Sequence, residues 1–141
     1  MAGDARPTIL VVEDDERVRD FITTTLAAAD YNVLQAKGGL DGISTMLGYD
    51  GEISMAVVEI KMPGINGLDL ANQIGIERPA TEVLYVSDLD RSVAVESIAR
   101  EKPEAMLPRP FTAGQLLKRV RNLSRRKAHR MGQLRKQLST K

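Results

Sequence analysis

The chain has no cysteine and no tryptophan, and its 141 residues include only two phenylalanines and three tyrosines. Without thiols it can form no disulfide, no thiolate nucleophile and no cysteine-based metal site. Its apolar runs are far shorter than the roughly 18 residues that a membrane-spanning helix needs. The acids Asp4 and Asp14 near the start are not typical of a secretory signal peptide. We therefore expect a cytoplasmic protein.

Acidic residues are also missing from residues 111–141. The first 110 residues carry all 19 Asp and Glu but 10 of the 20 Lys and Arg, and residues 111–141 carry the other 10. The formal net charge of +1 therefore conceals an acidic body and a basic tail. Such a tail indicates an anionic partner, and the charge alone leaves nucleic acid, membrane, protein and the chain's own body open.

Short apolar runs alternate along the chain with segments of helical spacing. We predict five strands, at 8–12, 31–36, 53–60, 81–87 and 104–107. The helices between them are predicted within 15–30, 38–49, 66–76 and 89–102. A last helix is expected after Thr112, a good N-cap residue, and to run toward the end of the chain. Five strand–helix repeats predict a doubly wound α/β fold whose parallel sheet is covered by helices on both faces.

Polar side chains collect where the predicted strands end, which is where doubly wound sheets bind their ligands. The residues at these ends are Glu13, Asp14 and Asp15, then Glu59, then Ser87 and Asp88, and finally Arg109. Carboxylates that converge on one cleft repel each other, so a cation, a metal such as Mg²⁺ or a proton must offset their charge. Arg109 is the basic side chain on the fifth strand that could do so.

Four segments, ILVVEDDERVRDFI, VVEIKMPGINGLDL, VLYVSDL and LPRPFT, resemble the signature blocks of the response-regulator receiver domain of two-component signalling. The resemblance covers about residues 7–123. It implies a flavodoxin-like (βα)5 fold with sheet order 2-1-3-4-5. We accordingly expect a receiver domain over residues 1–123 and a basic helical extension over residues 124–141.

The resemblance also implies roles for individual residues. In the family, an acidic pair holds Mg²⁺, an Asp at the end of the third strand accepts a phosphoryl group, and a Ser/Thr and a Lys contact that group. By position, Glu13 and Asp14 form the acidic pair, and Glu59 stands where the acceptor would be. Ser87 and Arg109 stand at the two contact positions, and the peptide bond after Arg109 is expected to be cis.

Two further roles follow from the same resemblance. Met106 takes the position of an aromatic switch residue, but ordinary core packing is the favoured interpretation of this flexible Met side chain. If Mg²⁺ binds, its expected ligands are Asp14, Glu59 and the backbone carbonyl of Lys61, with Glu13 acting through water.

Three positions depart from the family pattern, because Glu59 replaces Asp, Arg109 replaces Lys and Met106 replaces an aromatic residue. The extra methylene moves the Glu59 carboxylate by more than about 1 Å, a misplacement that can cost roughly a hundredfold in rate. Its longer reach predicts contacts with Ser87 and a salt bridge with Arg109, whose planar fork suits a carboxylate. The alternative is a Glu59 that simply faces solvent. We predict a degenerate receiver that is not phosphorylated in the usual way.

The tail shows heptad spacing, at Val120, Ser124, Lys127, Met131, Leu134 and Leu138, although two of these six positions are polar. The spacing predicts a connector or dimerisation helix, and a solvated charged helix is the alternative. Nucleic-acid binding is less favoured, because no aromatic residue follows Phe111 and no second recognition element is present. His129 is interpreted as a surface residue.

We therefore expect a non-enzymatic signalling module in a constitutive interaction, through its last strands and helices and its C-terminal helix. The expected partner is a protein, such as a histidine kinase or an output domain, or a second copy of the chain. Three alternatives remain open. They are a receiver phosphorylated at Glu59 or Ser87, the N-terminal regulatory domain of a longer regulator with a cyclic-di-GMP or DNA-binding output, and nucleic-acid binding through the tail.

Overall fold

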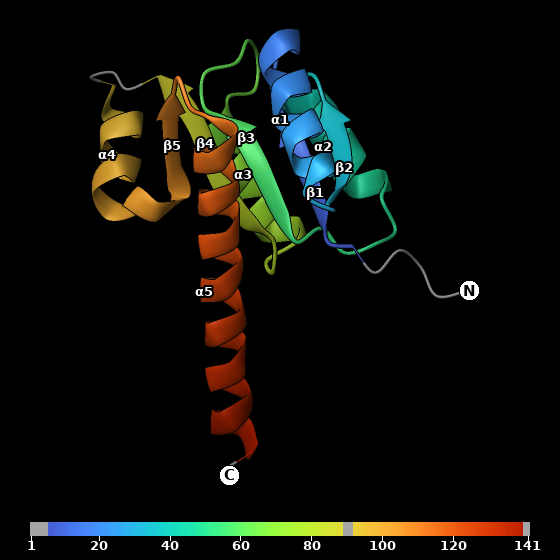
Figure 1. The fold of residues 1–141 in the computed structure, drawn as a ribbon, viewed down its shortest axis with the longest axis vertical. Coiled ribbons are helices and arrows are strands. Elements are labelled where there is room, and N and C mark those ends of the chain that lie inside the picture. Colours follow the sequence, from blue (N-terminus) through green and yellow to red (C-terminus); the bar gives the residue numbers. More distant parts are fainter. Residues whose placement is uncertain (1–5, 89–91, 140–141) are drawn as a thin grey trace.

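The computed structural model describes residues 6–88 and 92–139 (Figure 1). The strands are β1 Thr8–Val12, β2 Asn32–Ala36, β3 Met55–Glu59, β4 Glu82–Asp88 and β5 Met106–Arg109. The helices are α1 Glu16–Ala28, α2 Gly39–Gly48, α3 Gly67–Glu77, α4 Val93–Glu101 and α5 Ala113–Ser139, with a short 3-10 turn, η1, at Pro103–Ala105.

All five strands pair in parallel in the order β2-β1-β3-β4-β5, which confirms the predicted topology. Alternate residues of each strand point to opposite faces of the sheet, so the chain builds two large apolar layers. In β1, Ile9 and Val11 join the layer beneath α1 and α5, whereas Leu10 and Val12 join the layer beneath α2 and α3. All five residues of β1 are buried, as expected of a parallel strand covered on both faces.

The fifth strand begins later than predicted, at Met106 instead of residue 104. Pro103 starts the 3-10 turn η1, in which the Ala105 amide donates to the Lys102 carbonyl at 2.9 Å. The fixed φ of proline and its missing N–H favour a turn there over an extended strand. The strand ends at Arg109, which lies at the carboxyl edge of the sheet. The helix α4 begins at Val93, and residues 89–91 of its predicted range lie outside the described residues.

Helix α5 begins after Thr112, as predicted. The Thr112 hydroxyl accepts from the Gln115 amide at 3.1 Å, and the Gln115 side chain accepts from the Thr112 amide at 2.8 Å, which makes a reciprocal cap. The helix then runs without a break through the expected domain boundary at residue 123 and projects away from the body (Figure 1). None of the described helices, α5 included, is long and apolar enough to cross a bilayer.

Candidate functional site

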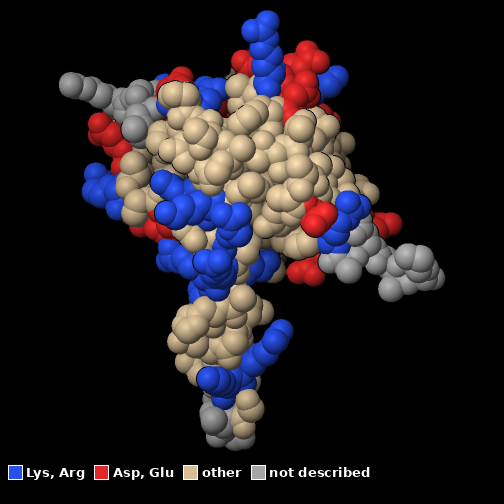
Figure 2. All heavy atoms as spheres, in the orientation of Figure 1, with Lys and Arg blue, Asp and Glu red and all other residues tan. Residues whose placement is uncertain are grey.

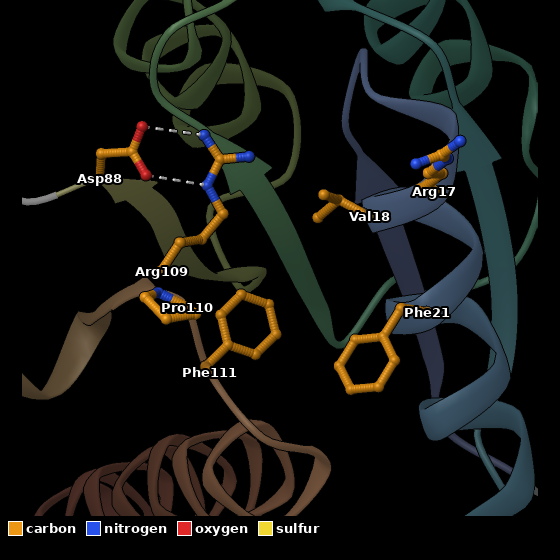
Figure 3. Close-up of a pocket in the computed structure, with 7 residues that line it drawn as sticks. All are labelled: Arg17, Val18, Phe21, Asp88, Arg109, Pro110 and Phe111. Atoms are coloured by element: carbon orange, nitrogen blue, oxygen red, sulfur yellow. Dashed lines mark hydrogen bonds and ion pairs between the residues drawn. The ribbon is translucent and has the colours of Figure 1, made fainter.

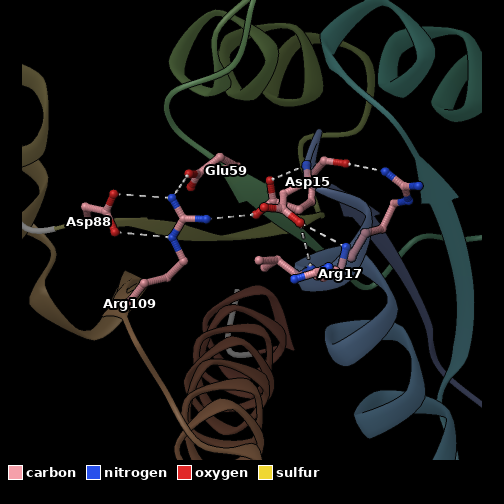
Figure 4. A network of polar contacts seen from close by, with 8 residues as sticks. Asp15, Arg17, Glu59, Asp88 and Arg109 are labelled. Carbon is pink, nitrogen blue, oxygen red and sulfur yellow. Dashed lines mark hydrogen bonds and ion pairs between the residues drawn. The ribbon is translucent and has the colours of Figure 1, made fainter.

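The carboxyl ends of four strands bring the predicted residues together at one edge of the sheet (Figure 4). Strand β1 leads into Glu13, and β3 ends with Glu59. Ser87 lies near the end of β4, where the register places Asp88 beside Arg109 of β5. Residues far apart in sequence therefore meet because parallel strands end at the same edge.

Arg109 is the centre of this edge. Its Nη2 lies 2.8 Å from Glu59 Oε1, which confirms the predicted salt bridge. Its Nε lies 3.4 Å from Asp88 Oδ1, and its Nη1 lies 3.7 Å from Glu13 Oε1. One guanidinium thus contacts carboxylates from three other strands or their ends, as Figure 4 shows. The bond between Arg109 and Pro110 is cis, as expected.

The two glutamates of this cluster are almost free of solvent, because Glu13 and Glu59 are each 2% exposed. Burial raises the pKa of Glu59 to about 7, with a further rise from Glu13 and an opposing effect of Arg109. Burial likewise raises the pKa of Glu13 to about 7 against the hydrogen bond from the Asp15 amide and the charge of Arg109. Desolvation therefore outweighs a single cation that two buried carboxylates share.

Three polar atoms of the site are buried without a hydrogen-bond partner among the described residues. They are Glu13 Oε1, Glu59 Oε2 and Ser87 Oγ. The expected hydrogen bond between Ser87 and Glu59 is therefore not found, although Ser87 is fully buried at the same edge. Glu59 turns toward Arg109 and not toward solvent, so the solvent-facing alternative is wrong.

The three acids after β1 have different surroundings. The Asp15 side chain accepts from the Arg17 amide at 2.9 Å and from the Val18 amide at 3.3 Å, which caps α1. Asp14 is exposed, whereas Glu13 is buried. Only Glu13 of the predicted acidic pair therefore contacts Arg109.

Two contacts of the site were not predicted. Asp88 pairs with Arg109, and the Arg19 Nη1 donates to the Glu13 backbone carbonyl at 2.9 Å. The first could have been found, since Asp88 directly follows Ser87 on a strand that neighbours β5. The second depends on the way α1 folds back over the end of β1, for which the sequence carries no signal.

The loop from β3 to α3 approaches the site closely. A side chain at Gly67 would collide with the Glu59 backbone, because an added Cβ would lie 2.2 Å from the Glu59 carbonyl oxygen. Gly64 in the same loop has a φ of +75°, a conformation that other residues rarely adopt. These two glycines let α3 start directly against the end of β3. Lys61, which lies between them and the strand, is exposed.

The comparisons with known proteins agree with this architecture. The sequence profile described as "Response regulator receiver domain" matches residues 9–121. The chain belongs to this family. The "Sensor kinase CckA" of Brucella abortus (strain 2308) is 26% identical over 116 residues, which are 82% of this receiver domain chain and 12% of that protein.

Two further relatives are similarly distant. The "Cyclic di-GMP phosphodiesterase" of Thermotoga maritima is 23% identical over 124 residues, or 88% of this chain and 33% of that protein. The "Transcriptional regulatory protein CusR" of Escherichia coli (strain K12) is 28% identical over 120 residues, or 85% of this chain and 52% of that protein. The receiver chain thus spans between 12% and 52% of the length of these three relatives.

Solved structures share the fold at low sequence identity. A CheY-like response regulator receiver domain protein from Methanospirillum hungatei JF-1 superposes with a TM-score of 0.77 at 19% identity, covering 89% of this chain and 99% of the other. A receiver domain protein from Clostridium thermocellum reaches 0.73 at 22% identity, covering 86% and 97%. This similarity shows the receiver fold.

The arrangement of this receiver does not fit the Mg²⁺ site that the family implies. The Arg109 guanidinium already contacts Glu59 and Glu13, so a divalent cation bound by both carboxylates would have to displace it. Over residues 6–88 and 92–139, no three acidic or histidine side chains converge as metal ligands do. Asp14 is exposed and makes no contact with Arg109. Among the described residues, the cation that Glu13 and Glu59 contact is the Arg109 guanidinium.

Met106, at the position of the aromatic switch, belongs to the core. It is 3% exposed and packs with Ile60 and Val95 in a small apolar cluster beneath α4. Half-buried Tyr85, its neighbour in the register of β4 and β5, packs against the same cluster. Met106 therefore packs in the core, as the favoured interpretation of the sequence predicted.

A shallow pocket of about 420 Å³ opens beside Arg109 (Figure 3). Its floor is aromatic, since the rings of Phe21 and Phe111 lie 6.0 Å apart at 50°. Arg17 of α1 lines the side opposite Arg109 and Asp88. The pocket borders the charged edge without containing the buried glutamates.

Proposed function

We propose that this receiver domain holds one signalling state without phosphorylation. The observation that carries the proposal is the 2.8 Å contact between Arg109 Nη2 and Glu59 Oε1. In the family, the residues at these two positions accept and contact a phosphoryl group. Here they contact each other, so an internal ion pair stands where a transient phosphoryl contact would form.

Glu59 is a poor phosphoryl acceptor on two physical grounds. Its carboxylate lies one methylene farther from the strand than that of Asp, and in-line transfer tolerates little displacement. Burial also raises its pKa to about 7, so near neutral pH Glu59 carries a proton more often than an ordinary carboxyl does. A protonated carboxyl is not a nucleophile, which lowers the reactive fraction further.

Arg109 supports a fixed state because it links several strand ends at once. Its guanidinium lies between Glu59 on one side and Asp88 on the other. An entering phosphoryl group would have to displace both carboxylates from the same cation, and it would bring further negative charge to a cluster already short of cations. The end of β4 is thus tied to the end of β3 in the absence of any phosphoryl group.

We propose that the module is non-enzymatic and cytoplasmic, and that it acts through constitutive contact with a protein, such as a histidine kinase or an output domain, or with a second copy. Its receiver part would span residues 1–123, and residues 124–141 would connect it to that partner. The contact would use the last strands and helices, where α4, β5 and α5 lie side by side (Figure 1).

A second candidate is the regulatory domain of a longer regulator. Helix α5 continues unbroken to Ser139, and the chain matches only part of each relative described above, among them a cyclic di-GMP phosphodiesterase and a transcriptional regulator. A connector helix of this kind would pass the state of the receiver to a cyclic-di-GMP or DNA-binding output domain.

An amide NMR titration with Mg²⁺ and then beryllofluoride, a phosphoryl mimic, tests the proposal. We expect no saturable shifts at Glu13, Glu59, Ser87 or Arg109 in the natural chain. The double variant Glu59→Asp, Arg109→Lys rebuilds the family pattern and is expected to show saturable shifts that reach β5. Saturable shifts in the natural chain, or uptake of label from a small acyl phosphate at Glu59 or Ser87, would overturn the proposal.

A further inference from the structure

Eight of the nine Lys and Arg residues of α5 fall into two sets, and Arg135, which is exposed, belongs to neither. One set faces the body and is engaged there. Its members are Arg119, which donates to the Pro103 and Met106 carbonyls, Arg126, which pairs with Glu104 at 2.6 Å, Lys127, which donates to the Ser54 carbonyl, and Arg130, which pairs with Glu82. These contacts hold the helix against η1 and the first residues of β4 and β5, and against the residue before β3.

The second set, which we term the outward basic stripe, consists of Lys118, Arg121, Arg125 and Lys136. All four side chains are exposed, and none has a hydrogen bond or ion pair with another residue that the structure describes. Their spacings of 3, 4 and 11 residues keep them on one helix face, since 11 residues make three turns. Their span of 18 residues corresponds to about 27 Å of helix.

This stripe has no compensating charge along the helix. Residues 111–141 contain no acid, so no acidic side chain of α5 can pair with it from the next turn. Figure 2 shows Lys and Arg gathered over α5 where it leaves the body, with acidic side chains confined to the body itself. Like charges at such spacing destabilise a helix slightly, and an anionic partner would remove that cost.

The surroundings of the stripe do not suit a protein partner. Interface cores between proteins are apolar and poor in charge. The neighbours of the stripe on the same face are polar or small, namely Asn122, His129, Gly132 and Gln133. The exposed apolar residues of the tail, Met131, Leu134 and Leu138, instead continue the opposite face, on which Leu116 and Leu123 are buried.

We infer that the outward basic stripe binds the phosphate backbone of double-stranded nucleic acid without reading its sequence. A line of four cations over about 27 Å matches about eight base pairs at 3.4 Å each. The acidic body repels phosphate and so confines the contact to α5. No aromatic residue follows Phe111, which removes the stacking that single strands use. The inference does not depend on the state of the site at Glu59.

Fluorescence anisotropy of a labelled duplex of about 20 base pairs, titrated with the 141-residue chain between about 50 and 200 mM salt, tests the inference. Four phosphate contacts predict a slope of log affinity against log salt of about −3.6. The double variant Arg121→Gln, Arg125→Gln should lower that slope by about 2 and weaken binding about tenfold or more at low salt. Circular dichroism would verify that the variant keeps its helix content.

The matched control is Lys37→Gln, Arg100→Gln, which removes the same charge from two exposed side chains of the body that have no partner among residues 6–88 and 92–139. It should leave the slope unchanged. Equal losses in the two variants, or no salt-dependent binding by the natural chain, would overturn the inference. Polyglutamate that binds as tightly as the duplex at the same salt would also overturn it, because the occupant would then be an acidic protein.

Discussion

Arginine pairs with glutamate at two ends of this molecule, and the surroundings of the pairs differ. At the carboxyl edge of the sheet, Arg109 contacts Glu59, whose side chain is 2% exposed. On α5, Arg126 is 53% exposed and its partner Glu104 is 33% exposed. The same chemical pair is therefore largely shielded from solvent at one end and solvated at the other.

The pKa values of the two glutamates show what that difference does. Burial raises the pKa of Glu59 to about 7 even though Arg109 lies beside it. The pKa of Glu104 is lowered instead, first by a hydrogen bond from its own backbone and then by Arg126. In a buried pair, the loss of either partner is costly, because the charge that remains would be buried without compensation. An exposed pair contributes little to the free energy of unfolding, because water already solvates both charges.

Removing Arg109, the half-buried cation beside two buried carboxylates, should have the largest effect. Arg109→Met would leave Glu13 and Glu59 buried with no nearby cation, and we expect a loss of about 3 kcal/mol in the free energy of unfolding at pH 8. The loss should shrink at pH 5, where the carboxyls carry protons. Urea unfolding at both pH values measures the loss. A loss below about 1 kcal/mol at pH 8 would mean that the pair with Glu59 contributes no more than an exposed pair does.

The pH dependence of stability should be the next largest effect. Glu13 and Glu59 have pKa values of about 7 in the folded chain against an ordinary value of 4.5, so the folded chain binds more protons between these pH values. Their contribution to stability is therefore complete below about pH 4.5 and is lost as the pH rises through about 7. We expect the chain to unfold more easily at pH 8 than at pH 5, by about 2 kcal/mol or more.

The variant Glu59→Gln is the control for that prediction. Gln does not titrate and can still accept from Arg109, so the difference between pH 5 and pH 8 should fall by about half. An unchanged difference would assign the titration to other groups.

The two pairs made by exposed arginines of α5 should matter less. The double variant Arg126→Met, Arg130→Met removes the contacts to Glu104 and Glu82, and we expect a loss below about 1 kcal/mol per pair in urea unfolding. About 0.5 M added salt should reduce the loss, because exposed pairs are screened. A loss equal to that of Arg109→Met would mean that the two ends do not differ.

The smallest effect on stability is expected in the part of α5 that projects away from the body. Leu134 is 51% exposed, so Leu134→Ala should change the unfolding free energy by less than about 0.5 kcal/mol. Leu123→Ala on the buried face of the same helix is the matched comparison, with an expected loss of about 2–4 kcal/mol. A loss above about 1 kcal/mol for Leu134→Ala that grows with protein concentration would show that a second copy covers this residue.

Much of the site could be predicted because strand ends are readable in a sequence. Glu59 and Arg109 follow apolar runs of strand length, and parallel strands bring such ends to one edge. The hydrogen bond from Ser87 was predicted wrongly, because chain distance says nothing about the direction of a side chain. The start of β5 was also misplaced, since Pro103 favours a turn over the apolar pattern around it.

The sequence by itself determined the five strand–helix repeats, the parallel sheet and the long last helix, because hydrophobic spacing and capping residues act locally. Only the tertiary structure decided that one guanidinium is shared by Glu13, Glu59 and Asp88, and that α5 keeps four of its nine cations engaged with the body. Those contacts join segments far apart in the chain, and their strength depends on how much water the packing leaves around each charge.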